Sequence, residues 1–302
     1  MGSEFWWFYD VLAVAAAGVC IFISGKKGVL KAFTSLFCFI LALGVAYGVS
    51  DTMSQSIYTN TVKNSNYKKL CSSVNNYKLA EKISENLTDL GYGGRIDRTK
   101  IQKILESKKP IDDQIYKYFK DLNVNSPKQI DSKEEFVKKL QAGYSEIVKG
   151  IVSDQLSKYS AECAADKVLK EPQTFYDLVP LLIDKEDQDP AAMYIAENYT
   201  AQPYTYLIRL FIFVIMFVIV VVVSEFIVSL ALTAAAIEQS LISNIFGGLI
   251  GILKGAAVVL VIAAAVRLYV IMGSNEMLFF NHEAIDKTYI FRYAYDIVVD
   301  KL

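Results

Sequence analysis

Two long apolar blocks, residues 5–50 and 204–272, constrain this chain more than any other feature of its sequence. Within the second block, residues 210–223 form an unbroken apolar run. A helix needs about 20 apolar residues to cross a bilayer core of about 30 Å, and each block holds enough residues for two such helices. The sequence therefore predicts four transmembrane helices, at residues 5–24, 29–49, 204–232 and 245–272.

The residues between the two blocks have the composition of a soluble protein and are rich in Lys, Asp and Glu. The chain is 53% hydrophobic, and the excess over an ordinary soluble domain lies in the apolar blocks. We expect an all-α, polytopic membrane protein: transmembrane residues 1–50 and 204–272, a soluble helical insert at 51–203, and an amphipathic tail at 273–302. The tail is expected either to lie at the membrane interface or to pack under the insert.

Helix signals recur through the insert, and strand alternation is hard to find. Ser132 and Glu135 form a capping box that opens a long helix, which could extend to about Lys170. Gly91 is a plausible left-handed cap, and the pair Asp189 and Pro190 starts a further helix. The other helices are expected at residues 77–90, 97–106, 111–122 and 175–183.

The orientation of the membrane helices follows from the basic residues in their short loops. Lys26 and Lys27 lie in the turn between the first two helices, and Lys31 comes just after it. The N-terminal flank carries Glu4 and Asp10 instead. Because Lys and Arg favour the cytoplasmic side, we expect the turn in the cytoplasm, and both termini and the insert outside.

The fourth predicted helix opens with glycines four residues apart, at Gly247, Gly251 and Gly255. This spacing places all three on one face of a helix, where small residues let two backbones approach closely. Two interpretations stay open. The stripe packs against another helix of the same chain, or it forms a seam between copies of the chain in a homo-oligomer or pore.

Charged residues within the apolar blocks need partners, because an ionised side chain in a bilayer is costly. Arg209 and Arg267 are expected near the same outer interface, where they can extend toward water. Glu225 and Lys254 lie deeper, toward the cytoplasmic side, and are expected to approach each other. They form a structural ion pair or belong to a conduction or proton path.

Two motifs in the membrane blocks resemble those of the bacterial colicin V production protein (CvpA) family. The first is an Asp, an apolar run, a Gly-x-basic-Gly turn, and then a basic residue and a Ser, here Asp10, Gly25, Lys27, Gly28, Lys31 and Ser35. The second is a glycine run with one basic residue, here Gly247, Gly251, Lys254 and Gly255.

This resemblance covers about half of the chain and implies four membrane helices. It also implies a link to colicin V production, toxin export and envelope homeostasis. Some members carry a serine protease after the fourth helix, which implies an outside C-terminus. The chain departs from the family pattern in two places. Ser243 and Asn244 stand where an acidic and basic pair is common, and the insert is far longer than the usual loop.

Several kinds of site are not expected. A net charge of −1 gives no field that favours nucleic acid. The insert contains no histidine, which excludes Ser-His-Asp catalysis and His-bearing zinc sites there. The acidic residues 184–189 lack the EF-hand pattern, so a solvated loop is expected. His282 is expected at the surface, and Cys71 and Cys163 are either a disulfide or two free thiols.

We therefore expect no enzymatic activity, no metal and no cofactor, and two functional hypotheses remain. In the first, the protein is an envelope scaffold, and its insert is the surface that binds an envelope protein partner. In the second, it is an oligomeric channel or transport component whose pore is lined by the fourth helix, with Glu225 or Lys254.

Overall fold

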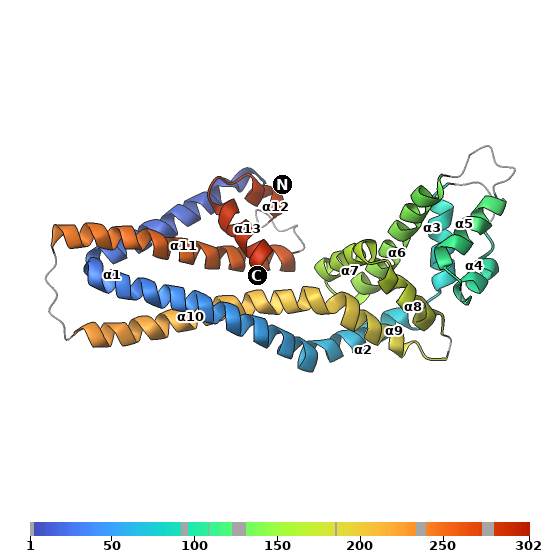
Figure 1. Cartoon of the computed structure of the whole chain (residues 1–302), viewed down its shortest axis with the longest axis horizontal. Helices are drawn as coiled ribbons and strands as arrows, with labels where there is room; N and C mark the ends of the chain where they lie inside the picture. The colour runs from blue at the N-terminus through green and yellow to red at the C-terminus, as the bar shows by residue number, and fades with distance from the viewer. Residues whose placement is uncertain are drawn as a thin grey trace. The chain divides into compact units, whose positions relative to one another are not determined.

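The computed structural model describes residues 3–91, 96–107, 109–122, 131–184, 186–233, 240–273 and 281–302. Every regular element in these ranges is helical, which confirms the all-α expectation. The chain divides into two compact units (Figure 1). One unit, the membrane unit, comprises Met1–Tyr58 and Thr205–Leu302. The other, Thr59–Tyr204, is the insert.

Three helices are long and apolar enough to cross a membrane. They contain α1 (Trp7–Ile57), α10 (Ala201–Thr233) and α11 (Leu241–Met272). Helix α1 covers both the first and the second predicted segments. It is broken at Gly28, which has φ 71° and ψ 168°. Figure 1 draws α1 as two arms that turn back on each other. The count of four crossings remains a prediction.

The break in α1 depends on a residue without a side chain. A positive φ is easily adopted by glycine and is costly for other residues. The backbone N–H of Val29, at the start of the second arm, donates to Ser243 Oγ of α11 at 2.9 Å. A Cβ on Gly28 would lie 2.9 Å from that same oxygen. Gly28 therefore supplies the turn and leaves room for the cap.

The C-terminal segment forms two short helices, α12 (His282–Asp286) and α13 (Phe291–Lys301). Helix α13 packs against α11 and α1 in the membrane unit. Its buried side chains are Phe291, Tyr295 and Val298. Tyr293 and Ile297 remain exposed on the other side of α13. Residues 274–280, which begin the predicted tail, lie outside the described residues.

The insert consists of eight α-helices among its described residues, with a π-helical turn at each end. The helices are α2 (Lys63–Val74), α3 (Leu79–Asp89), α4 (Arg98–Leu105), α5 (Ile111–Leu122), α6 (Lys133–Gln155), α7 (Lys158–Lys170), α8 (Gln173–Ile183) and α9 (Asp189–Ile195), and the π-helical turns are η2 (Tyr58–Val62) and η3 (Ala196–Thr200). A short 3₁₀ turn, η1 (Ser3–Phe5), precedes α1 in the membrane unit.

Local signals set the ends of several of these helices. Ser132 Oγ accepts the Glu135 backbone N–H at 3.3 Å, as its capping box predicts. Gly91, with φ 69°, follows α3 in the left-handed conformation. The prediction that one helix extends from Ser132 to about Lys170 was wrong. Helix α6 ends at Gln155, and α7 begins after Ser157, whose side chain caps the new helix by accepting from the Ser160 N–H.

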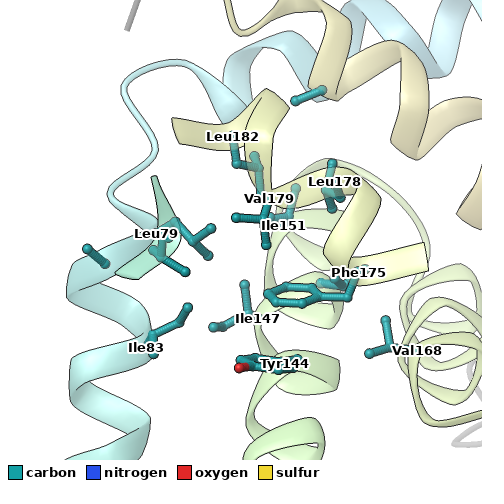
Figure 2. Packing of buried hydrophobic residues seen from close by; sticks show 14 of the residues in the cluster. Leu79, Ile83, Tyr144, Ile147, Ile151, Val168, Phe175, Leu178, Val179 and Leu182 are labelled. Carbon is teal, nitrogen blue, oxygen red and sulfur yellow. The ribbon is translucent and has the colours of Figure 1, made fainter. Parts of the chain in front are cut away.

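The helices of the insert surround one large apolar cluster. Figure 2 shows side chains from α3, α6, α7 and α8 meeting in this core. Tyr144 stacks on Phe175 with ring centroids 4.2 Å apart. The Tyr144 and Tyr176 hydroxyls both donate to Asp112, at 3.0 and 2.5 Å. The carboxylate thus gives both hydroxyls an acceptor beside the core.

The two ends of the insert lie next to each other. Lys63 at the start of α2 pairs with Glu197 of η3 at 2.5 Å. Nearby, Asn66 donates to Thr200 Oγ1 at 3.2 Å, and both residues are buried. A domain whose entry and exit are adjacent can be inserted between two helices without separating them.

Candidate functional site

A cluster of charged side chains lies between three apolar helices of the membrane unit. Lys27 from α1 places its Nζ 2.8 Å from Glu225 Oε2 of α10. Lys254 from α11 places its Nζ 3.6 Å from the other carboxylate oxygen and donates to Ser35 Oγ at 2.5 Å. We call Lys27, Ser35, Glu225 and Lys254 the charge cluster. It brings together the two residues that were expected to approach and two from the turn motif.

The charge cluster is most enclosed at Lys254. Its side chain is only 4% exposed, against 24% for Glu225 and 35% for Lys27. Lys254 Nζ also lies 4.9 Å from the centre of the Phe39 ring. A buried ammonium without a partner is strongly unfavourable. The Glu225 carboxylate balances the positive charges of Lys27 and Lys254. Removal of its negative charge would leave two ammonium groups close together among apolar side chains.

The glycine stripe fixes how closely α11 approaches the first arm of α1. A Cβ on Gly247 would lie 2.6 Å from Ser24 O, and one on Gly251 would lie 2.5 Å from Ile21 Cα. At Gly255 the nearest atom is Ala17 Cα, at 2.8 Å. Real Cβ atoms do not come this close to backbone. All three glycines therefore face α1 of the same chain, which is the first of the two interpretations left open.

The two motifs of the family resemblance meet in one place. Gly25 lies against α11, where its Cβ would be 3.4 Å from Asn244 O. Ser243, which departs from the family pattern, caps the second arm of α1. Lys31 is half-buried, and its side chain forms no hydrogen bond or ion pair with the other residues that the structure describes. The turn of the first motif and the glycine run of the second thus form one contact between α1 and α11.

Asp10 lies apart from the charge cluster and has a different role. Its carboxylate accepts three consecutive backbone N–H groups, from Tyr289 at 2.8 Å, Ile290 at 2.9 Å and Phe291 at 3.0 Å. These groups lie at the N-terminus of α13, where a carboxylate is favoured. Asp10 therefore ties the first helix to the C-terminal segment across almost the whole sequence.

A second polar group surrounds Arg267 of α11. Its guanidinium donates to Tyr206 at 3.4 Å and Tyr295 at 3.2 Å, and lies 2.9 Å from His282 Nε2. His282 was expected at the surface and is instead half-buried, because α12 places it against Arg267. Burial, and then the positive charge of Arg267, lower the pKa of His282. Burial raises the pKa of Tyr295 to about 12.

Arg209, the other arginine expected near the outer interface, lies in α10 beside the second arm of α1. Its guanidinium is 3.4 Å from Asp51 Oδ1 and lies 4.8 Å from the Tyr47 ring centre. Tyr206, which Arg267 contacts, is three positions before Arg209 on α10, so both arginines lie near the same stretch of that helix. This position is consistent with the expectation that Arg209 and Arg267 lie near the same membrane interface.

The insert contains no cluster of His, Cys, Asp and Glu suited to a metal among the residues that the structure describes. The acidic stretch at 184–189 makes local turns, in which Asp184 accepts the backbone N–H of Glu186 at 2.9 Å. Lys185 of this stretch lies outside the described residues. Cys71 and Cys163 are not joined by a disulfide.

A groove follows the contact between α3 and α6 on the insert. One end is a hollow of about 230 Å³ lined mainly by apolar side chains, including Ile83, Leu87 and Leu140. The adjoining hollow, of about 510 Å³, shares Asn86 and Glu146 with it and adds the polar residues Glu85, Asp154 and Lys82. No pattern in the sequence pointed to this α3–α6 groove, because its walls come from helices far apart in the chain.

Comparison with known proteins identifies no relative: no family model, no curated protein and no solved structure matches this chain. The resemblance to the colicin V production protein family therefore rests on the two motifs alone.

Proposed function

We propose that this protein crosses the bacterial cytoplasmic membrane four times. The break at Gly28 supports this count, because it divides α1 into arms of residues 7–27 and 29–57. At a rise of 1.5 Å per residue, the arms are about 30 and 43 Å long, each enough for the bilayer core. The charge cluster then lies toward the cytoplasmic end of these helices, with Lys254 buried and Lys27 and Glu225 partly exposed.

In the proposed orientation, Lys26 and Lys27 lie in the cytoplasm, and both termini and the insert lie outside. Single cysteines in a cysteine-free variant test this proposal, with a membrane-impermeant maleimide added to intact cells. We expect labelling at Glu162→Cys in the insert and at Lys301→Cys, and none at Lys26→Cys until the cells are opened. Labelling of Lys26→Cys alone in intact cells would show the opposite orientation.

The function that the geometry supports best is a non-enzymatic envelope scaffold whose insert binds a protein partner. The α3–α6 groove is the observation that carries this proposal. Its apolar end is the size of a pocket for one or two anchoring side chains, the kind of contact that dominates protein interfaces. Glu85, Glu146 and Asp154 outnumber Lys82 along its polar end. The groove therefore suits a basic segment with an apolar anchor.

A photoreactive amino acid at Asp89, which lines the groove, tests this function in native membranes. We expect one discrete cross-linked protein, and we expect Glu146→Lys to lower its yield several-fold by reversing the charge of the groove. Glu162→Lys on α7 is the matched control and leaves the yield unchanged. If the cross-linking yield at Asp89 is the same with and without Glu146→Lys, the groove is not the binding surface.

By the family resemblance, the partner would belong to a toxin-export or envelope-maintenance system. This assignment is tested by deletion in the native host. Loss of envelope integrity or of bacteriocin secretion, restored by the wild-type gene and not by the Glu146→Lys variant, would connect the groove to that role. If the Glu146→Lys variant fully restores envelope integrity and secretion, the groove does not serve that role.

The charge cluster favours a second candidate, a channel or transport component. Ionisable residues at bilayer depth often mark ion or proton paths. The contact of the stripe glycines with α1 argues against a pore seam made by these glycines. Flux of protons and small ions into liposomes tests the candidate. Flux above that of empty liposomes that is abolished by Glu225→Gln supports it, whereas background flux for the wild-type protein rejects it.

A further inference from the structure

A hollow lies between the first arm of α1 and the beginning of α11. Its volume is about 460 Å³, within the range of about 300–1,000 Å³ typical of ligand clefts. Ile21, Phe22 and Lys26 contribute from α1, and Asn244 and Leu249 contribute from α11. Figure 1 shows these two helices side by side in the membrane unit.

Two glycines line this hollow, and helix packing does not require either of them. A Cβ on Gly25 would meet its nearest atom at 3.4 Å, and one on Gly248 at 3.7 Å, both ordinary contact distances. Gly247 and Gly251 differ, because their Cβ atoms would lie 2.6 and 2.5 Å from the α1 backbone. Close packing therefore explains Gly247 and Gly251, whereas Gly25 and Gly248 leave space at the surface.

The rim of the hollow is apolar and faces outward. Phe22 is 62% exposed and Leu249 is 53% exposed. Such side chains on a membrane helix contact hydrocarbon, so the hollow opens toward acyl chains. Lys26 gives one end a positive charge, with its Nζ 4.3 Å from the centre of the Phe22 ring. An apolar hollow that ends at an ammonium group suits an amphiphile with an anionic head.

We propose that this hollow binds one anionic glycerophospholipid of the surrounding bilayer. One acyl chain lies over Gly25 and Gly248, and the phosphate pairs with the Lys26 ammonium. In the proposed topology the site belongs to the cytoplasmic leaflet, where a basic residue favours anionic lipid. The proposal depends on membrane insertion and is independent of what the insert binds.

Native mass spectrometry of the full-length protein released from detergent tests the proposal. Phosphatidylglycerol and phosphatidylcholine with the same palmitoyl and oleoyl chains are titrated separately. We expect one tightly retained lipid per chain and about fivefold tighter binding of phosphatidylglycerol, the ratio that one nearby lysine gives. Equal retention of the two lipids would overturn the anionic assignment.

Four variants locate the site. Lys26→Gln is expected to remove the preference for phosphatidylglycerol, and Lys31→Gln is its charge-matched control. Gly248→Leu fills the hollow and is expected to lower retention of both lipids at least tenfold. Gly18→Leu, on the first arm of α1 with open space around its Cβ, is the matched control and is expected to retain both lipids.

Each remaining outcome also decides the question. Retention unaffected by Gly248→Leu would place the lipid elsewhere and overturn the proposal. A dimer that excludes lipid and dissociates in Gly248→Leu would assign the hollow to a second copy of the chain instead. If Gly248→Leu does not fold, the loss of selectivity in Lys26→Gln against Lys31→Gln still supports or refutes the site.

Discussion

Replacement of Gly251 by alanine tests the contact on which the membrane unit depends. The new Cβ would lie 2.5 Å from Ile21 Cα and 2.7 Å from Cys20 O. Both atoms belong to backbone, so no side-chain rotation relieves the overlap. Favourable carbon contacts begin near about 3.5 Å, and the two helices must therefore separate by about 1 Å.

The cost of this separation can be calculated from dispersion contacts. A gap of up to about 1 Å removes about a quarter to a half of the attraction between each atom pair. With about 50 atom pairs at about 0.15 kcal/mol each, the loss is about 2–4 kcal/mol. Measured costs of overpacking, about 1–3 kcal/mol, overlap this range. We expect Gly251→Ala to lower the free energy of unfolding by about 2–3 kcal/mol.

Unfolding of the membrane unit by dodecyl sulfate in mixed micelles measures this free energy. Trp6 and Trp7 are the only tryptophans of the chain and lie at the start of α1, so their fluorescence reports on that helix. Gly248→Ala is the matched control, since its Cβ would meet no atom nearer than Ile21 Cγ2, at 3.7 Å. Equal stability of the two variants would refute the close in-chain packing of the glycine stripe.

Three further predictions concern polar contacts. Asp10→Ala removes the cap of α13 and should destabilise its docking by about 1–2 kcal/mol, measured as about tenfold faster amide exchange at the start of that helix. The pKa of His282 is lowered when the C-terminal segment is docked, so protonation favours the undocked state. Docking of α13 should therefore be stable above pH 6.5 and should weaken as the pH falls below it. Amide exchange of α13 against pH measures this, and His282→Ala should flatten the profile. Asp112→Ala leaves the Tyr144 hydroxyl without its acceptor and should cost about 2 kcal/mol, or about 4–8 °C in the melting temperature of the insert.

The pH dependence of Asp112 itself has the opposite sign. Burial is the main cause that raises the pKa of this carboxyl, and the hydrogen bonds from Tyr176 and Tyr144 oppose the shift. The folded insert therefore binds the proton more tightly than the unfolded chain does. The resulting stabilisation is present at acidic pH and is lost as pH rises through the folded-state pKa.

Local signals in the sequence predict most helices of the insert, but α2 (Lys63–Val74) was not predicted. The Ser132 cap, the start at Asp189 and Pro190, and the left-handed Gly91 each depend on residues a few positions apart. The boundary between α6 and α7 was missed because apolar residues continue across it. The interruption lies at Leu156, whose backbone is extended, and at Ser157, whose side chain caps α7; the Ser157 cap is a local signal that the prediction overlooked.

The charge cluster could be predicted only in part. Glu225 and Lys254 stand out because ionised residues are rare in apolar runs, and their proximity follows from the connection between their helices. Lys27 and Ser35 join them through the pairing of α1 with α11, which helical periodicity does not specify. The glycine stripe predicted a close helix contact without identifying the helix that it meets.

The contacts of α1 with α10 and α11 also bear on the order in which the protein is assembled. Lys27 and Glu225 are 198 residues apart, so about 10–40 s of synthesis separate them at about 5–20 residues per second. In the proposed topology, the first hairpin enters the bilayer before Glu225, which pairs with Lys27, and Ser243, which caps its second arm, have been synthesised. In that topology, we expect the first hairpin to reach its final packing only after α10 and α11 have been synthesised.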